Sequence, residues 1–139
     1  MKKLITILFF IFCVSQLIAQ NYKLSKAYSF DATAFENKST ISKYHNGFIY
    51  TLSTLYNSYP DMDPGSGQFV ISGLGVNDFF LQKLDSEGNL VWAKAWGSTE
   101  NDFARDFEVS DEGIYIVGSF NSLVDFDPGP NTFNILSPN

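Results

Sequence analysis

The chain has 139 residues, a formal net charge of −6 and one cysteine. Nucleic-acid binding is a poor fit for an acidic chain with a single arginine, because phosphate contacts need clustered lysine and arginine. One cysteine cannot form an internal disulfide, so burial of apolar side chains must stabilise the fold.

The N-terminus has the layout of a secretory signal peptide. The sequence starts with MKK, continues with an apolar run from Leu4 to Val14 and then reaches the small residue Ala19. This eleven-residue run is too short to cross a bilayer, which needs about 20 residues. Phe12, directly before Cys13, argues against lipid attachment at that cysteine. We expect residues 1–19 to be removed, which leaves a secreted or cell-surface chain with no cysteine, no transmembrane segment and, without the two N-terminal lysines, a net charge of −8.

A fifteen-residue phrase occurs twice after the signal. NSYPDMDPGSGQFVI (residues 57–71) and NSLVDFDPGPNTFNI (residues 121–135) share eight of fifteen positions. The similarity extends upstream, where residues 24–42 align with 92–110 and residues 46–53 align with 112–119 with Gly47 opposite Gly113. Self-similarity at such a period is typical of repeat folds. Within a single repeat region over residues 20–139, we expect a first unit at 24–91 and an incomplete second unit at 92–139.

Short segments with alternating apolar residues predict strands. These segments are Lys38 to Lys43, Phe48 to Leu55, Phe79 to Asp85 and Leu90 to Trp96. The last segment places Leu90, Trp92 and Trp96 on one face and small residues on the other, which indicates sheets packed face to face. Glycine in the polar loop 85–89 is typical of a hairpin.

Four short antiparallel strands per unit, with a long link between the second and the third, predict a β-propeller blade. We therefore expect an all-β fold, namely a β-propeller repeat fragment of four-stranded antiparallel blades with about one and a half blades present.

Three segments, FFLQKLDSEGNLVWAKAWGS, DFEVSDEGIYIVGSF and VDFDPGPNTFNI, resemble the secreted bacterial β-propeller repeat family. The resemblance covers residues 24–139 and is strongest from Asp61 onward. It implies an exported propeller and no single reaction. Because a propeller typically needs 4–8 blades, we interpret the chain either as part of a longer protein or as a short product that closes a ring by self-association through an open blade edge.

The Asp-x-Asp-Pro-Gly motif occurs at Asp61/Asp63 and again at Asp125/Asp127. Carboxylates at i and i+2 lie on the same side of an extended segment, and their oxygens suit Ca²⁺. Proline followed by glycine is also typical of a type II turn, in which the preceding aspartate bonds the backbone two residues further on. The turn is our preferred interpretation, and a calcium site formed by the four aspartates is the alternative.

Other polar residues carry weaker signals. His45, the single histidine, is predicted to be a solvated loop residue. The acidic segment 101–106 is interpreted as a loop at a blade edge, with carbohydrate or cation contact as the alternative. Lys26 and Lys94 are expected on outer strands, with their stems buried and their charged ends in water.

The sequence contains no P-loop, G-x-S-x-G, H-E-x-x-H or paired-cysteine motif. We therefore expect a non-catalytic exported module with a structural or binding role and a protein or carbohydrate ligand. Two alternatives stay open. One is a calcium-stabilised cell-surface adhesin or carbohydrate-binding propeller, which calcium-dependent folding would favour. The other is a propeller-type hydrolase, which needs catalytic acids that converge at one mouth of the ring.

Overall fold

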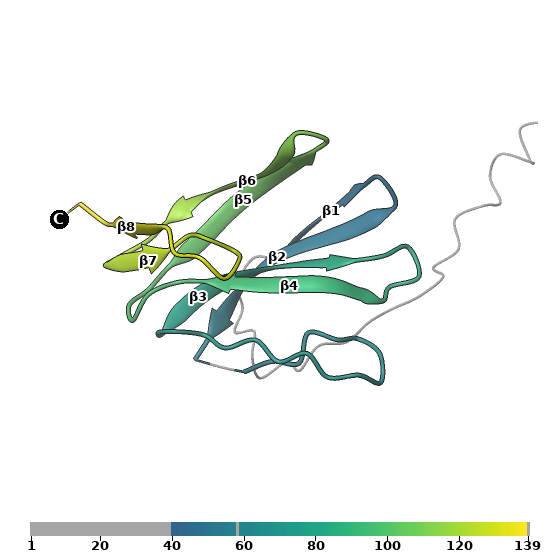
Figure 1. Ribbon diagram of the computed structural model, residues 1–139, viewed down its shortest axis with the longest axis horizontal. Helices are drawn as coiled ribbons and strands as arrows, with labels where there is room; N and C mark the ends of the chain where they lie inside the picture. Colours follow the sequence, from purple (N-terminus) through teal and green to yellow (C-terminus); the bar gives the residue numbers. More distant parts are fainter. Residues whose placement is uncertain (1–39, 58, 139) are drawn as a thin grey trace, which may run out of the picture.

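A computed structural model describes residues 40–57 and 59–138 of the chain. The predicted signal peptide, the start of the predicted first unit and Lys26 lie outside these residues. Within them the fold is all-β, with eight strands in antiparallel pairs and no helix (Figure 1). A helix able to span a membrane is accordingly not found in this part of the chain.

Four consecutive strands form the main sheet in the order β1-β2-β3-β4. Their bounds are Ile41–His45 (β1), Phe48–Tyr56 (β2), Asn77–Leu84 (β3) and Leu90–Trp96 (β4). The four predicted strands of the first unit are therefore confirmed in kind and order, although β1 ends two residues later than predicted. It extends to His45 because Asn46 (φ 47°) and Gly47 (φ 84°) make a two-residue turn, and this turn needs positive φ at both positions.

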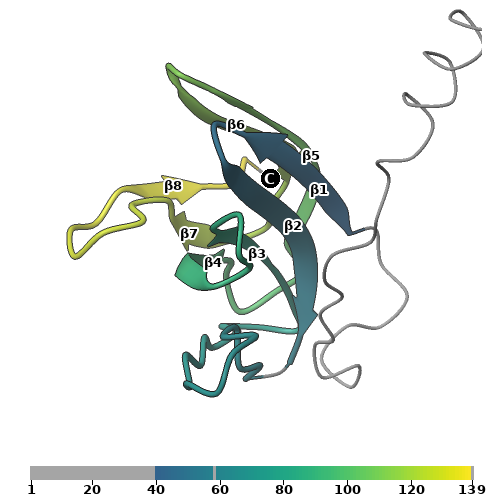
Figure 2. The ribbon, with the colours of Figure 1, turned by 90° about the vertical axis from the view of Figure 1, so that its right-hand side faces the viewer.

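The remaining strands form two separate two-stranded sheets. One contains β5 (Phe103–Ser110) and β6 (Gly113–Ser119), and the other contains β7 (Leu123–Asp125) and β8 (Asn134–Leu136). Figure 1 shows β5 and β6 on one side of the main sheet and the link between β2 and β3 on the other. Figure 2 shows the β7–β8 hairpin projecting away from the main sheet.

The turn between β1 and β2 is equivalent to the turn between β5 and β6. The sequence alignment placed these two turns one residue out of register. His45 pairs with Phe48, and Ser110 pairs with Gly113. Gly113 therefore opens β6, as Phe48 opens β2, and does not correspond to Gly47 in the turn. The alignment that placed Gly47 opposite Gly113 is therefore wrong, because Gly113 (φ 151°) belongs to the start of β6 and not to the turn.

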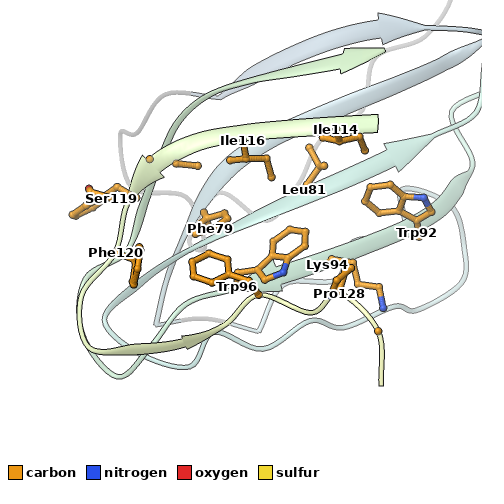
Figure 3. Close-up of a pocket in the computed structure, with 15 residues that line it drawn as sticks. Phe79, Leu81, Trp92, Lys94, Trp96, Ile114, Ile116, Ser119, Phe120 and Pro128 are labelled. Carbon is orange, nitrogen blue, oxygen red and sulfur yellow. The ribbon is translucent and has the colours of Figure 1, made fainter. Parts of the chain in front are cut away.

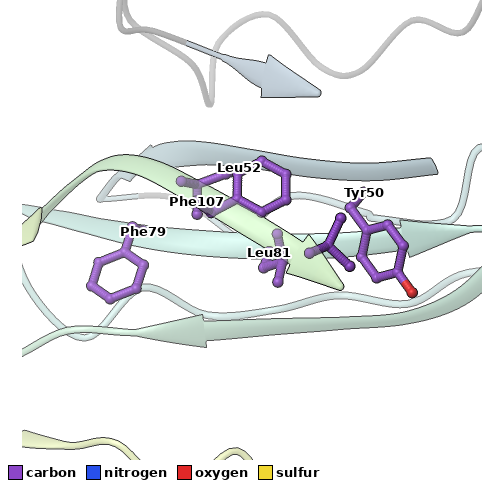
Figure 4. Close-up of a cluster of buried hydrophobic side chains, with 6 residues drawn as sticks. Tyr50, Leu52, Phe79, Leu81 and Phe107 are labelled. Atoms are coloured by element: carbon purple, nitrogen blue, oxygen red, sulfur yellow. The ribbon is translucent and has the colours of Figure 1, made fainter. Parts of the chain in front are cut away.

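The first core cluster holds the β5–β6 sheet against the main sheet (Figure 4). It contains buried side chains from β2, β3 and β5, namely Tyr50, Leu52, Phe79, Leu81, Phe107 and Val109. Trp92 and Trp96 of β4 pack around it, and the Trp96 ring stacks on Phe79 with their centroids 5.7 Å apart. Large side chains therefore fill the face of the main sheet that meets β5 and β6.

The second core cluster lies on the opposite face of the main sheet, beneath the link between β2 and β3. Its buried members are Leu55, Met62, Ile71, Phe80 and Ala93. Met62 and Ile71 come from the link, so this cluster fixes the link onto β2, β3 and β4. The predicted contrast between a face of large residues and a face of small residues is confirmed for Trp92 and Ala93.

A β-bulge in β4 corrects one detail of that prediction. Lys83 pairs with Trp92 while Leu84 pairs with Leu90, which leaves Val91 as an extra residue. Leu90 consequently packs against the second cluster. The prediction that Leu90 shares a face with Trp92 is wrong, because the bulge reverses the alternation at this point.

Candidate functional site: an apolar cleft and two acidic hairpins

The first Asp-x-Asp-Pro-Gly segment forms a hairpin that its own carboxylates hold together. Oδ1 of Asp61 accepts hydrogen bonds from the backbone N–H groups of Asp63 (3.0 Å) and Phe69 (2.8 Å). Oδ1 of Asp63 accepts one from the N–H of Gly65 at 2.8 Å. The N–H groups of Phe69 and Asp63 hold the pKa of Asp61 below its ordinary value, because they stabilise the ionised carboxylate.

The second segment repeats this arrangement 64 residues later. Oδ1 of Asp125 accepts the N–H groups of Asp127 (3.0 Å) and Phe133 (2.7 Å), and Oδ1 of Asp127 accepts the N–H of Gly129 at 2.5 Å. The N–H of Phe126 donates to the carbonyl of Phe133 at 2.9 Å, which matches the bond between Met62 and Phe69. The four aspartates therefore serve the backbone of their own hairpins.

The predicted type II turn is wrong in both hairpins. That turn needs positive φ at glycine, and neither Gly65 nor Gly129 has it. The aspartate side chains take the place of a backbone turn by bonding two residues ahead. Glycine is favoured for a different reason, since a Cβ at Gly129 would lie 2.9 Å from Oδ1 of Asp127.

Calcium binding by these aspartates stays a prediction. Across residues 40–57 and 59–138, no group of three or more histidine, cysteine or acidic residues is arranged to hold a metal ion. Asp61 and Asp125 each direct one oxygen at two N–H groups, so a cation would have to share these carboxylates with the backbone.

Two buried aspartates were not identified as a pair from the sequence. Asp78 and Asp102 follow asparagine and precede phenylalanine in the two Asn-Asp-Phe triplets. The Asn77 side-chain amide donates to Oδ1 of Asn101, and the N–H of Asp102 donates to the carbonyl of Asn77 at 2.7 Å. The shared triplet, at a spacing of 24 residues, is the signal that would have found this contact.

Asp102 is fully buried and lies in the loop before β5, whereas Asp106 lies within β5, so the loop predicted for residues 101–106 is confirmed at Asp102 and is wrong for residues 103–106. Its Oδ2 accepts bonds from the N–H and the hydroxyl of Ser98 at 2.6 and 2.8 Å. Its Oδ1 accepts the N–H of Asn121 at 2.8 Å. These bonds tie the end of β4 to the segment that follows β6, which is a structural role.

Asp78 is 1% exposed and is less well satisfied. Its Oδ2 accepts the N–H groups of Leu74 (2.6 Å) and Gly75 (3.0 Å), whereas its Oδ1 has no hydrogen-bond partner in the described part of the chain. Burial raises the pKa of Asp78 above its ordinary value; the two N–H groups oppose this shift, and the charge of Asp102 adds to it.

His45 is not the solvated loop residue that was predicted. It ends β1, is partly buried, and its Nε2 lies 3.0 Å from Oδ1 of Asp111 in the turn between β5 and β6. The side-chain amide of Asn46 donates to the same oxygen at 2.6 Å. The two turns therefore meet, and Lys43 adds a second link through a 2.7 Å ion pair with Glu108.

An apolar cleft of about 770 Å³ opens between the main sheet and β6 (Figure 3). Its floor is the large-residue face of the main sheet, with Trp92, Lys94 and Trp96 from β4. Ile114 and Ile116 line it from β6 and point toward β3 and β4. Lys94 is exposed, as predicted for an outer strand, and among the described residues that line the cleft it is the one with a charge.

The end of the cleft is formed by the second hairpin and the segment before it. Phe120 and Phe126 meet there edge to face, with ring centroids 5.2 Å apart, and Pro128 and Gly129 complete the lining. A concave apolar surface with few polar groups is suited to binding a ligand.

Comparison of the chain with protein-family models, with curated proteins and with solved structures finds no match. Function is therefore inferred from the cleft, the hairpins and the sequence itself.

Proposed function

We propose that this chain is a non-catalytic β-propeller repeat module of an exported protein, with a structural or binding role. The observation that carries the proposal is the identity of the two acidic hairpins. Each makes the same three carboxylate bonds to its backbone, and the two sets lie 64 residues apart. Repeated local geometry at a fixed spacing is what a repeat architecture requires.

The packing of the sheets supports propeller stacking. The main sheet has the four consecutive antiparallel strands of a blade. The β5–β6 sheet packs on its large-residue face through Phe107 and Val109, as the first two strands of a neighbouring blade would.

The placement of acidic groups supports binding over catalysis. The aspartates of both hairpins accept backbone N–H bonds, and so do Asp85 and Asp102. Among the residues that the structure describes, those that line the cleft include no carboxylate. A hydrolase would need acids that face a common space. The four hairpin aspartates, Asp85 and Asp102 are instead engaged by backbone N–H groups.

Export is supported by the sequence of residues 1–19 alone. Expression with secretion in a bacterial host, followed by intact mass measurement of the exported protein, tests it. A mature chain that begins at Gln20 supports the proposal, and one that still carries residues 1–19 contradicts it.

The repeat architecture is tested by extending the chain. Asn139 aligns with Gly75, so a second copy of residues 76–96 fused after Asn139 supplies the third and fourth strands of the second unit in register. We expect the fusion to remain monomeric and to unfold at higher urea concentration than the parent. The matched control is a fusion of the same composition in shuffled order. Equal stability of the two fusions would contradict the propeller-repeat proposal.

A further inference from the structure

We infer that the cleft beside β6 is a docking site for a β-hairpin of another chain, with phenylalanine and glutamine on its first strand and alanines on its second. The inference rests on the proposed repeat architecture, because the filled counterpart of the cleft is the second core cluster of the same chain. The β3–β4 hairpin of this chain cannot supply the occupant, since β3 is already paired with β2.

The second core cluster is the site in the first repeat that corresponds to the cleft, and it is filled. In it, Leu55 lies near the end of β2 and packs with Met62 of the first hairpin. At the equivalent place Phe120 follows β6 and packs edge to face with Phe126 of the second hairpin. The first site is completed by Phe80 of β3. The second site has no such residue in the described part of the chain, and the cleft lies there.

Residues of the second core cluster are less exposed than their counterparts at the cleft, as expected for a filled site and an open one. Leu55 and Met62 are fully buried, whereas Phe120 and Phe126 are only partly buried. Ile71 of the first hairpin is 8% exposed, and Ile135 at the matching position of the second is 39% exposed. Apolar surface left in water is the driving force for a partner to bind.

Gln82 indicates which polar side chain the docked hairpin should carry. This buried side chain donates from Nε2 to the carbonyl of Met62 at 2.6 Å. The corresponding carbonyl in the second hairpin is that of Phe126. A glutamine two positions after the phenylalanine of the incoming strand, as Gln82 follows Phe80, would reach it and fix the register of binding.

The second strand of the occupant must carry small side chains. Ala93 and Ala95 of β4 occupy the second cluster, on the face opposite the tryptophans. The open cleft already holds Trp92 and Trp96 on its floor, so a large residue at the Ala93 position would collide with them. The occupant therefore presents its small face to the large face of the main sheet.

The edge of β6 supplies the backbone contacts. Among the described strands, β6 pairs only with β5, whereas β2 pairs with both β1 and β3. An edge strand has a row of N–H and C=O groups that can pair with an added strand, and adjoining apolar pockets give the pairing its specificity.

The test uses a fluorescein-labelled synthetic peptide of residues 76–96 and the purified chain. Fluorescence anisotropy measures binding, and hydrogen exchange with mass spectrometry locates it. We expect saturable binding and slower exchange in Gly113–Ser119. A peptide with Phe80→Asp should bind at least about tenfold more weakly, which corresponds to about 1.4 kcal/mol.

The decisive control is a peptide with Ala93→Trp. Non-specific adhesion to an apolar surface predicts tighter binding of this more hydrophobic peptide, whereas the proposed geometry predicts binding at least about tenfold weaker. Equal or tighter binding of the Ala93→Trp peptide, or unchanged exchange in β6 at saturation, overturns the inference. If the fused copy of residues 76–96 stabilises the chain and the free peptide does not bind, the repeat architecture stands and docking of a separate chain fails. If neither has an effect, both fail.

Discussion

Replacement of Phe107 by alanine should loosen the β5–β6 sheet from the main sheet. Phe107 is 2% exposed and lies in the cluster that contains Leu52 and Leu81. Truncation of a buried phenylalanine costs about 3–5 kcal/mol, from lost burial and from the cavity left behind. A domain of this size has a total stability of about 5–15 kcal/mol, so the variant should unfold at much lower urea concentration.

The assay is urea unfolding followed by tryptophan fluorescence. The chain has two tryptophans, and both pack around the cluster that contains Phe107, so their emission reports on this region directly. The matched control is Tyr115→Ala, because Tyr115 lies on β6, is 60% exposed as a residue and should change stability by less than about 0.5 kcal/mol when truncated. A loss below about 1 kcal/mol for Phe107→Ala, similar to the control, would refute docking of β5 on the main sheet.

Three further outcomes are expected. Because burial raises the pKa of Asp78, the folded chain binds a proton there more tightly than the unfolded chain, so the contribution of Asp78 to stability should fall as pH rises through its raised pKa; Asp78→Asn should remove this contribution, and a stability difference between the two proteins that does not vary with pH would contradict it. Gly97→Ala should destabilise by about 1–3 kcal/mol in urea unfolding, because a Cβ there would overlap the Asp78 carboxylate, and the cost should shrink in an Asp78→Ala background. Asp125→Asn should lower the melting temperature only slightly, because the amide oxygen can still accept the two N–H bonds, and added calcium should shift neither protein; a calcium-induced rise in the wild type that the variant lacks would establish the metal site instead.

The strands of the main sheet could be predicted because their alternation is local. Each segment carries its own pattern of large and small residues, and Leu90–Trp96 was predicted with its observed bounds. The bulge at Val91 could not be predicted from this pattern, because the extra residue is visible only once β3 is placed beside β4.

The acidic hairpins were identified from the sequence, but their turn type was not. Proline followed by glycine favours a type II turn locally, yet two N–H bonds to one aspartate oxygen select a different backbone. The burial of Asp102 and the position of His45 could not be predicted for a similar reason. Their partners, Asn121 and Asp111, are distant in sequence, and single-residue patterns carry no information about such contacts.

Gln82 disfavours incorrect pairing between β2 and β3 in the main sheet. It lies opposite Thr51 across the β2–β3 pair and donates to the carbonyl of Met62. A slip of one residue between these strands would turn every side chain of β3 to the other face. Several apolar side chains could tolerate such a slip, but the slipped sheet would leave the carbonyl of Met62 without the amide and would place the amide among the aromatic residues of the first cluster. The glutamine thus makes an error in strand pairing costly, and a Gln82→Leu chain would be expected to sample alternative registers during refolding.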